Sequence, residues 1–204
     1  MKHLSKLSYL IIFIFGINSI LAQDKNNPWA ATIGANAIDF FPTGVGITTP
    51  DGNDVISSEN FGKDLFFVTD NWNYVEAVSS LGVTRYLGDG FNFELSSSIN
   101  RINRLGESRV QNLSWVNFDG TIQFSFKHLI NDVDWLDPYI GIGGGHFWLD
   151  DENSGTFNSN IGINFWITET VAFTLDTNYK TAFKRNSLDF FQHRVGVKFA
   201  FGGK

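Results

Sequence analysis

The sequence predicts an all-β chain that forms an eight-stranded antiparallel up-and-down transmembrane β-barrel, and three observations support this fold class. Apolar and polar residues alternate with a period of two along eight segments. Beyond residue 28, no stretch shows the 3.6-residue period of a confident amphipathic helix. Charged residues make up only 18% of the 204-residue chain, below the roughly 25% of ordinary soluble domains.

The clearest alternation lies in the stretch FNFELSSSIN, residues 91–100. Phe91, Phe93 and Leu95 share one face of this strand, while Asn92 and Glu94 share the other. A tilted strand needs about 10 residues to cross a bilayer, and every segment has about that length or more. The predicted strands are 29–38, 74–87, 91–101, 113–127, 139–148, 157–166, 171–180 and 190–201.

The four prolines fit these boundaries. Pro28, Pro42, Pro50 and Pro138 all lie outside the predicted strands, where a missing N–H costs no ladder hydrogen bond.

The predicted connections alternate between long and short, as in outer-membrane barrels. If the first strand begins in the periplasm, connections 39–73, 102–112, 149–156 and 181–189 face outward, and 88–90, 128–138 and 167–170 face the periplasm. The inner connection 128–138 is longer than this pattern expects.

Aromatic residues gather near the predicted strand ends, where a membrane interface suits rings with one wet edge. The predicted interface aromatics are Trp29, Tyr86, Trp148 and Trp166, together with Tyr74, Trp115, Tyr139 and Tyr179.

A soluble eight-stranded barrel with an internal ligand is the rival interpretation, because alternation does not reveal which face is wet. The polar face consists mostly of Ser, Thr, Asn and Gly with few charges. That composition suits a crowded lumen, whereas a water-exposed wall would carry more Lys and Glu. The membrane barrel is therefore favoured, and its closure would satisfy every backbone group inside lipid.

The first residues predict a cleaved secretory signal. Lys2 and Lys6 precede the apolar run YLIIFIFGI, which is too short for a spanning helix of about 20 residues. With cleavage after Ala22, the chain divides into a signal peptide, 1–22, and a barrel, 23–204. Removing the two lysines from the 15 basic residues leaves 13 against 21 acidic residues. This acidic balance argues against a nucleic-acid partner. The chain has no cysteine, so we expect neither disulfides nor a lipid-modified cysteine.

Three stretches carry a resemblance to a known family: PYIGIGGGHFW (138–148), TFNSNIGINFWITETVAFTLDTNYKTAF (156–183) and FFQHRVGVKFAFGG (190–203). They resemble the N-terminal eight-stranded β-barrel of OmpA-like outer-membrane proteins, and the likeness extends more loosely back to residue 27. The resemblance implies a bacterial outer-membrane location with both termini periplasmic. It also implies contact with outer-membrane lipid and lipopolysaccharide, and recognition by the barrel-assembly machinery.

In that family the last strand resembles an assembly signal, and Arg194, Gly196, Phe199 and Phe201 match its polar, glycine and aromatic positions. Gly202 to Lys204 follow here, whereas the family's signal most often ends on the aromatic residue. Many family members continue into a peptidoglycan-binding domain, and residues 23–204 match only the barrel.

The inward-facing charges predicted by strand parity are balanced, with four acids and four bases. We expect Arg194 to contact Asp176 on the neighbouring strand, and Lys198 to lie near Glu94. A charge network that fills the lumen is favoured over a gated ion path, because eight strands leave a lumen just wide enough for side chains. The predicted set is Glu76, Glu94, Asp119, Asp176, Lys127, Lys180, Arg194 and Lys198.

No motif predicts catalysis, a cofactor or a metal site. His128, His146 and His193 show no metal-ligand spacing, and the last two share parity with lipid-facing residues. Ser187, Asp189 and His193 are close in sequence, but nothing in the sequence makes them converge. The glycine run 141–145 lies inside a strand and follows no phosphate-loop plan, so we expect it to make room for lumen neighbours.

Connection 39–73 combines many acids with several phenylalanines. It is open to three interpretations: ordered packing, contact with a protein partner, and calcium binding. For the whole chain the sequence favours a structural or interaction protein without catalysis. A narrow diffusion channel is the first alternative, and a lipid-modifying enzyme is the second.

Overall fold

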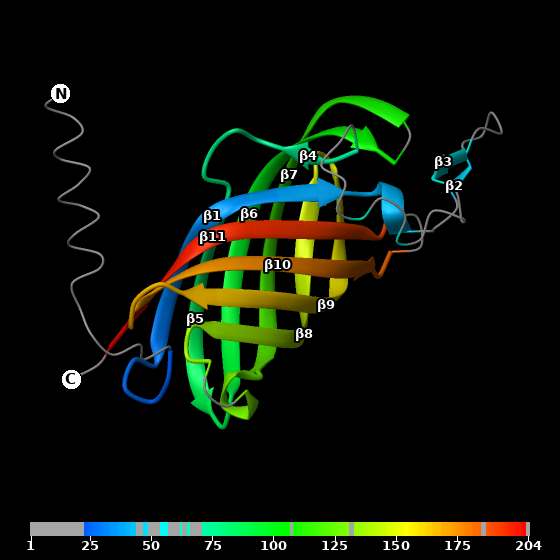
Figure 1. Ribbon diagram of the computed structural model, residues 1–204. Coiled ribbons are helices and arrows are strands. Elements are labelled where there is room, and N and C mark those ends of the chain that lie inside the picture. The colour runs from blue at the N-terminus through cyan, green and yellow to red at the C-terminus, as the bar shows by residue number, and fades with distance from the viewer. Residues whose placement is uncertain are drawn as a thin grey trace, which may run out of the picture.

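Eight long strands form a closed antiparallel ring within the residues that the structure describes. The computed structural model describes residues 23–43, 62, 65, 71–106, 108–130, 133–184 and 187–202, together with the backbone of 47–48 and 54–56. Each long strand pairs with the next along the chain, and the last pairs with the first (Figure 1), which confirms the predicted barrel. The strands are β1 (Trp29–Asp39), β5 (Ser80–Gly88), β6 (Phe91–Leu105), β7 (Ser108–Ser125), β8 (Leu136–Leu149), β9 (Glu152–Trp166), β10 (Val171–Ala182) and β11 (Phe190–Phe201).

The remaining elements are short. β2 (Ile47–Thr48) and β3 (Asp54–Ile56) form a small hairpin, and β4 (Asn73–Tyr74) pairs with the end of β1. Two 3₁₀ turns, η1 (Phe41–Thr43) and η3 (Lys127–Leu129), complete the described structure. In this part of the chain no helix is long and apolar enough to span a membrane. The predicted signal peptide and most of connection 39–73 lie outside the described residues.

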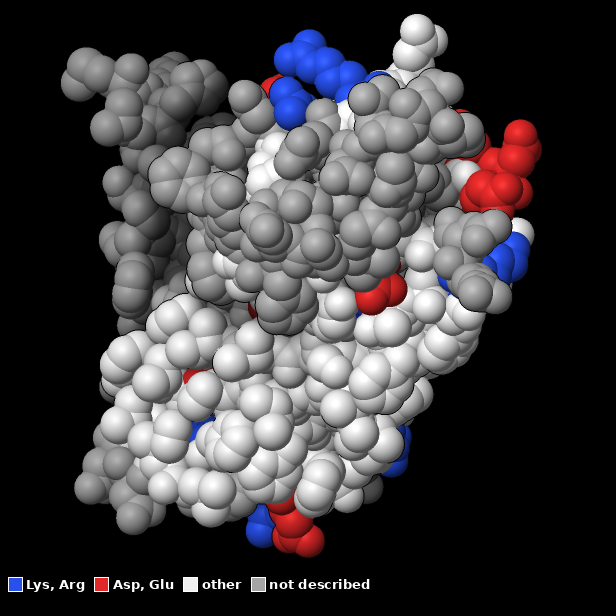
Figure 2. Space-filling model, turned by 90° about the vertical axis from the view of Figure 1, so that its right-hand side faces the viewer, with Lys and Arg blue, Asp and Glu red and all other residues white. Residues whose placement is uncertain are grey.

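The period-two alternation places apolar side chains outside the barrel and polar side chains inside. Large outward residues such as Leu95, Ile122 and Ile142 are exposed, whereas inward residues such as Thr121 and Gln123 are buried. In Figure 2 the wall below the grey residues is mostly white, and the charged residues gather toward the upper and lower ends of the view. An outer wall of this kind suits lipid rather than water.

The predicted strand 74–87 is wrong over its first third. β4 ends at Tyr74 and β5 begins only at Ser80. Tyr74 pairs with Ala37 and Ser80 with Gly34, so a six-residue advance on this strand matches a three-residue advance on β1. The pattern of apolar side chains does not predict such a bulge. The bulge depends on hydrogen bonds from polar residues of other strands, such as Asn36, to its backbone and side chains.

Two predicted outer connections are hairpins rather than open loops. β6 and β7 continue to Leu105 and Ser108 with a tight turn at Gly106, and β8 and β9 are joined by Asp150 and Asp151. Gly106 and Asp150 have φ values of 59° and 48°, which suit tight turns. Backbone pairing of these strands continues beyond the apolar wall. The outward residues there are polar, so the apolar–polar alternation ends before the strands do.

Pro138 also departs from the prediction, because it lies inside β8 rather than before it. It is the third residue of that strand and pairs with Ile163 of β9. On the other side, β7 has already ended at Ser125, the partner of Tyr139. The proline therefore occupies a strand end, where a missing N–H is tolerated.

Candidate functional site

Arg194 is the centre of a buried charge network in the barrel lumen. Its Nε atom lies 2.9 Å from Asp176 Oδ1, as the pairing of Asp176 and Arg194 across β10 and β11 predicts. Its terminal nitrogen lies 2.7 Å from Oε1 of Glu94, a contact that sequence reasoning missed. Glu94 belongs to β6, and two strands separate β6 from β11 in the ring. One guanidinium thus ties three strands together across the lumen.

A second ion pair joins Lys180 of β10 to Asp119 of β7. Lys180 Nζ and Asp119 Oδ2 are 2.5 Å apart, and the lysine is fully buried. Asn117 and Asn158 also donate to the carboxylate, at 2.6 and 2.9 Å. Buried ion pairs of this kind need such extra hydrogen bonds to offset desolvation. Both charges were predicted to face inward, but their pairing was not predicted.

Lys198 lies near enough to Glu94 to interact with it electrostatically, as predicted, but the two side chains do not form an ion pair. Arg194 and the side chains of Gln123 and Thr84 surround that carboxylate, the latter two at 3.3 and 3.4 Å from Oε2. Among the described side chains no carboxylate lies within 4 Å of Lys198 Nζ. Its ammonium instead lies 5.6 Å from the centre of the Tyr139 ring.

Two other predicted lumen charges lie elsewhere. Glu76 falls in the bulge between β4 and β5 and is exposed, because the bulge breaks the strand parity on which the prediction depended. Lys127 lies in η3, beyond the end of β7, and is half-buried at the barrel end. Burial lowers the pKa of Lys127, while the carboxylates of Asp134, Asp137 and Asp24 act in the opposite direction.

The inward glycines of β8 make room for this network. A Cβ atom on Gly145 would overlap the Asp119 carboxylate, and one on Gly141 would overlap the Asn160 amide. Gly144 faces outward, and its Cβ would meet only Thr156 O, at 3.4 Å. The glycines therefore leave room for the lumen side chains, as the sequence predicted.

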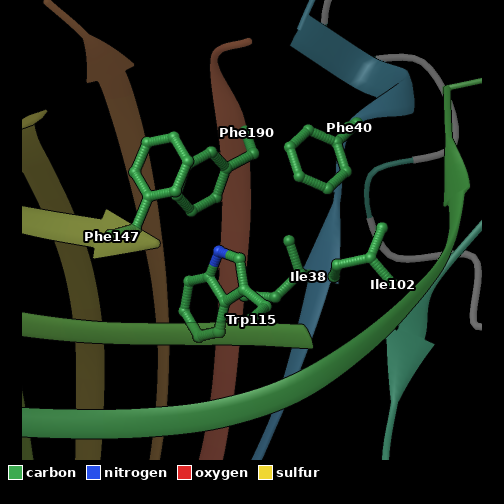
Figure 3. Close-up of a cluster of buried hydrophobic side chains, with 6 residues drawn as sticks. All are labelled: Ile38, Phe40, Ile102, Trp115, Phe147 and Phe190. Atoms are coloured by element: carbon green, nitrogen blue, oxygen red, sulfur yellow. The ribbon is translucent and has the colours of Figure 1, made fainter. Parts of the chain in front are cut away.

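An apolar cluster occupies the lumen at the end that carries the β6–β7 hairpin. Trp115, Phe147 and Phe190 are buried and meet edge to face, with ring centres 6.0 Å (Trp115 to Phe190) and 5.1 Å (Phe147 to Phe190) apart. The side chains point toward one another from separate strands (Figure 3). We call this cluster the aromatic plug, and its members are Ile38, Phe40, Ile102, Trp115, Phe147 and Phe190.

The aromatic plug corrects part of the predicted interface set. Trp29 and Trp148 do lie on the outer wall, 36% and 41% exposed. Trp115, Tyr139 and Trp166 instead are buried inside the barrel, and Tyr86 lines a cavity at the barrel end. Strand parity could have predicted the inward position of Trp115, because Trp115 lies on the same face of its strand as the inward Asn117 and Asp119.

The end opposite the aromatic plug is open as a polar cavity of about 450 Å³, which we call the vestibule. Side chains from the β5–β6 turn, from the β7–β8 connection and from the strand ends line it, among them Asp89, Asn92, Lys127, Asp134, Asn164 and Lys198. Gln23 and Asp24 also line it. Lys198 thus belongs to the vestibule as well as to the lumen.

The candidate catalytic and metal-binding side chains each have a different partner. Asp189 accepts hydrogen bonds from the Tyr179 hydroxyl and the Ala182 N–H, at 3.0 and 2.8 Å. His193 lies 3.0 Å from the Thr177 hydroxyl and stacks on Trp72. His146 packs against Trp148 on the outer wall, and the His128 side chain lies outside the described residues. The described side chains contain no cluster of three or more potential metal ligands.

The residues of the predicted assembly signal lie on both faces of β11. Phe199 and Phe201 are exposed on the wall, whereas Arg194 faces the lumen. Gly196 pairs with Gly34 across the seam between β11 and β1, and a Cβ on either would crowd the opposite backbone. Their role in assembly stays a prediction.

No protein-family model matches the sequence, and comparison with curated proteins gives no match either. Solved structures do match. OprG from Pseudomonas aeruginosa aligns with a TM-score of 0.56 at 11% identity, over 89% of this chain and 100% of that one. Neisserial surface protein A gives 0.52 at 11% identity, over 85% and 96%. The N-terminal β-barrel domain of Pseudomonas aeruginosa OprF gives 0.51 at 13% identity, over 84% and 97%. The TM-scores show a shared fold, and at identities this low the likeness shows the fold alone.

Proposed function

We propose that this protein is a non-catalytic integral β-barrel of the bacterial outer membrane with a structural or interaction role. One observation carries the proposal: the wall is apolar, while the lumen is filled by the charge network and the aromatic plug. A lumen blocked in this way leaves the outer surfaces and the open end of the barrel as the places where it can act. The solved barrels that share the fold are compatible with this location.

The orientation that we propose places both ends of the barrel polypeptide in the periplasm. Residues 23–28 and Gly202 lie at the same end of the barrel as the short β5–β6 and β9–β10 turns (Figure 1). The β6–β7 hairpin and the β2–β3 hairpin lie at the other end. Short turns inside and long connections outside are the usual arrangement of outer-membrane barrels.

We propose three kinds of partner: membrane lipids, the assembly machinery and a protein. Outer-membrane lipid and lipopolysaccharide would cover the wall, and the barrel-assembly machinery would recognise Arg194, Gly196, Phe199 and Phe201 on the last strand. A protein partner would bind through connection 39–73. Deleting residues 45–62 should then leave a folded barrel that no longer captures the partner, and a barrel that fails to fold would contradict a peripheral role for this connection.

A narrow diffusion channel is the competing function, and the vestibule favours it because a polar cavity leads from one end toward the ion pairs. Planar-bilayer recording of the purified barrel separates the two. We expect no discrete conductance steps, because the aromatic plug and the ion pairs block the path. Reproducible steps that Trp115→Phe does not alter and that Lys180→Met enlarges would instead support a channel.

Location and chain mass are the direct tests. The protein should fractionate with the outer membrane and resist extraction by urea or carbonate. Its intact mass after extraction should equal that of residues 23–204 if the predicted cleavage occurs. A larger mass would point to a further domain and to tethering at the cell wall.

A further inference from the structure

Lys198 is a largely buried lysine whose ammonium reaches the vestibule and has no acceptor among the residues that the structure describes. Lys198 is only 3% exposed and lines the vestibule. No described residue lies within ion-pair or hydrogen-bond distance of its Nζ atom. Burying a charge without hydrogen-bond partners is costly. The acceptors for Lys198 therefore come from water or from another occupant of the vestibule.

Charge balance within the lumen does not remove this requirement. Arg194 holds two carboxylates, Glu94 and Asp176, so this trio has one excess negative charge, which Lys198 offsets at a distance. This attraction acts at long range. It supplies no oxygen to accept the three N–H groups of Lys198.

Two amide oxygens beside the vestibule lack a hydrogen-bond donor, whereas Lys198 lacks an acceptor. The Oδ1 atoms of Asn92 and Asn164 are buried and have no donor among the residues that the structure describes. Both residues line the vestibule. The Asn164 amide is oriented by its Nδ2 atom, which donates to Asp137 at 2.9 Å. A matching occupant would present oxygen atoms to Lys198 and N–H groups to these two asparagines.

The mouth of the vestibule selects against a simple anion. Asp89 and Asp134 are exposed there, and the whole lining has four carboxylates against two lysines. An anion would be repelled at the mouth, whereas a positively charged group would be attracted. A ligand with a carboxylate at one end and an ammonium at the other satisfies both regions.

We propose that the vestibule binds a short peptide with a free C-terminal carboxylate and a free N-terminal ammonium. The carboxylate lies against Lys198, the backbone N–H groups donate to Asn92 and Asn164, and the N-terminal ammonium lies near Asp89 and Asp134. With the orientation proposed above, the vestibule opens to the periplasm. The binding itself does not depend on that orientation, so its test and the test of location can fail independently.

Calorimetric titration of the purified full chain in detergent micelles with tri-alanine is the test. We expect saturable one-to-one binding that weakens at least tenfold when the C-terminus is amidated. N-terminal acetylation should weaken binding by a smaller factor, because the mouth is more exposed to water. Acetate should not compete at equal concentration.

Lys198→Met should reduce tri-alanine affinity at least tenfold, while the exposed Lys184→Met at the other barrel end should leave it unchanged. Should Lys198→Met fail to fold, Asn92→Ala provides a second probe and should weaken binding several-fold. The proposal is overturned by absence of saturable binding, by equal binding of the amidated peptide, or by wild-type affinity in the Lys198 or Asn92 variant. Competition by acetate alone would also overturn it, because a simple anion site would then suffice.

Discussion

Single residues inside this barrel are fixed by their partners rather than by water. Arg194 contacts two carboxylates, and Lys180 contacts Asp119, which two asparagines also bond. In a low-dielectric lumen, loss of one partner leaves the other charge uncompensated. The loss of unfolding free energy in a variant should therefore depend more on the charged partners that stay buried than on the size of the residue removed.

Arg194→Met tests this dependence. The variant leaves Glu94 and Asp176 without their cation and should lower the free energy of unfolding by about 3–5 kcal/mol. Urea unfolding in lipid vesicles, followed by tryptophan fluorescence, measures the loss. The exposed Arg101→Met should change stability by less than about 0.5 kcal/mol, and a similar small change for Arg194→Met would disprove the role assigned to the network.

Gly145 and Gly144 form a matched pair for a second test. A methyl group on Gly145 would displace the Asp119 carboxylate from its three donors, so Gly145→Ala should cost about 1–3 kcal/mol. Gly144→Ala faces the lipid side and should stay within about 0.5 kcal/mol of wild type. Equal unfolding midpoints for the two variants would show that the glycine run does not make room for the network.

At the scale of elements, the break between β4 and β5 is the most unusual feature of the ring. Buried amides bridge it. The backbone and side-chain N–H groups of Asn36 bond Ser79, and the Asn73 side chain bonds four backbone groups. These bonds replace the ladder hydrogen bonds that the bulge removes. Polar side chains thus hold β1, β4 and β6 together where backbone pairing cannot.

Asn73→Ala should locally loosen this junction. The carbonyls of Ile38 and Arg104 and the N–H groups of Asn103 and Arg104 lose their partner, which should cost about 1–3 kcal/mol. Hydrogen exchange should accelerate at the amides of residues 103 and 104. In the control Asn103→Ala, whose side chain is exposed, these rates should stay at wild-type values; equal acceleration in both variants would refute the proposed bridge.

At the scale of the whole molecule, the aromatic plug closes one end of the lumen and the polar vestibule opens at the other. The aromatic plug fills the end with the longer hairpins, the ion pairs fill the middle, and the vestibule opens at the end with the short turns. The protein's own side chains therefore fill the closed end. Any small molecule that binds in the lumen should therefore bind in the vestibule at the opposite end.

Trp115→Ala should test the stabilising role of the aromatic plug. Removing this buried ring should lower the free energy of unfolding by about 3–5 kcal/mol. Trp115→Phe keeps the ring contacts and deletes a buried Nε1 group that has no acceptor among the described residues, so it should cost far less. Bilayer currents should stay absent in both variants, because the ion pairs beneath the aromatic plug still block the lumen. A large stability loss in Trp115→Phe would argue that the Nε1 group has a partner after all.

Much of the fold was predictable because strand alternation is a local property. The outward face of Phe91, Phe93 and Leu95 follows from residue order alone, and so does the contact of Arg194 with Asp176 on an adjacent strand. The bulge at residues 75–79 was not predictable, since it depends on amides from other strands. Trp115 and Trp166 were misplaced because their position near strand ends was weighed above their parity.

By itself the sequence determined the strands, the apolar wall and the inward position of most of the charges, because a β-strand turns successive side chains to opposite faces. Only the tertiary structure decided which strands face one another across the lumen. Ring closure and strand stagger brought Glu94 to Arg194 and gathered six apolar residues into the aromatic plug. They also placed Lys198 in the vestibule, where it has no acceptor among the described residues. These contacts join residues far apart in the chain, so no local pattern in the sequence encodes them.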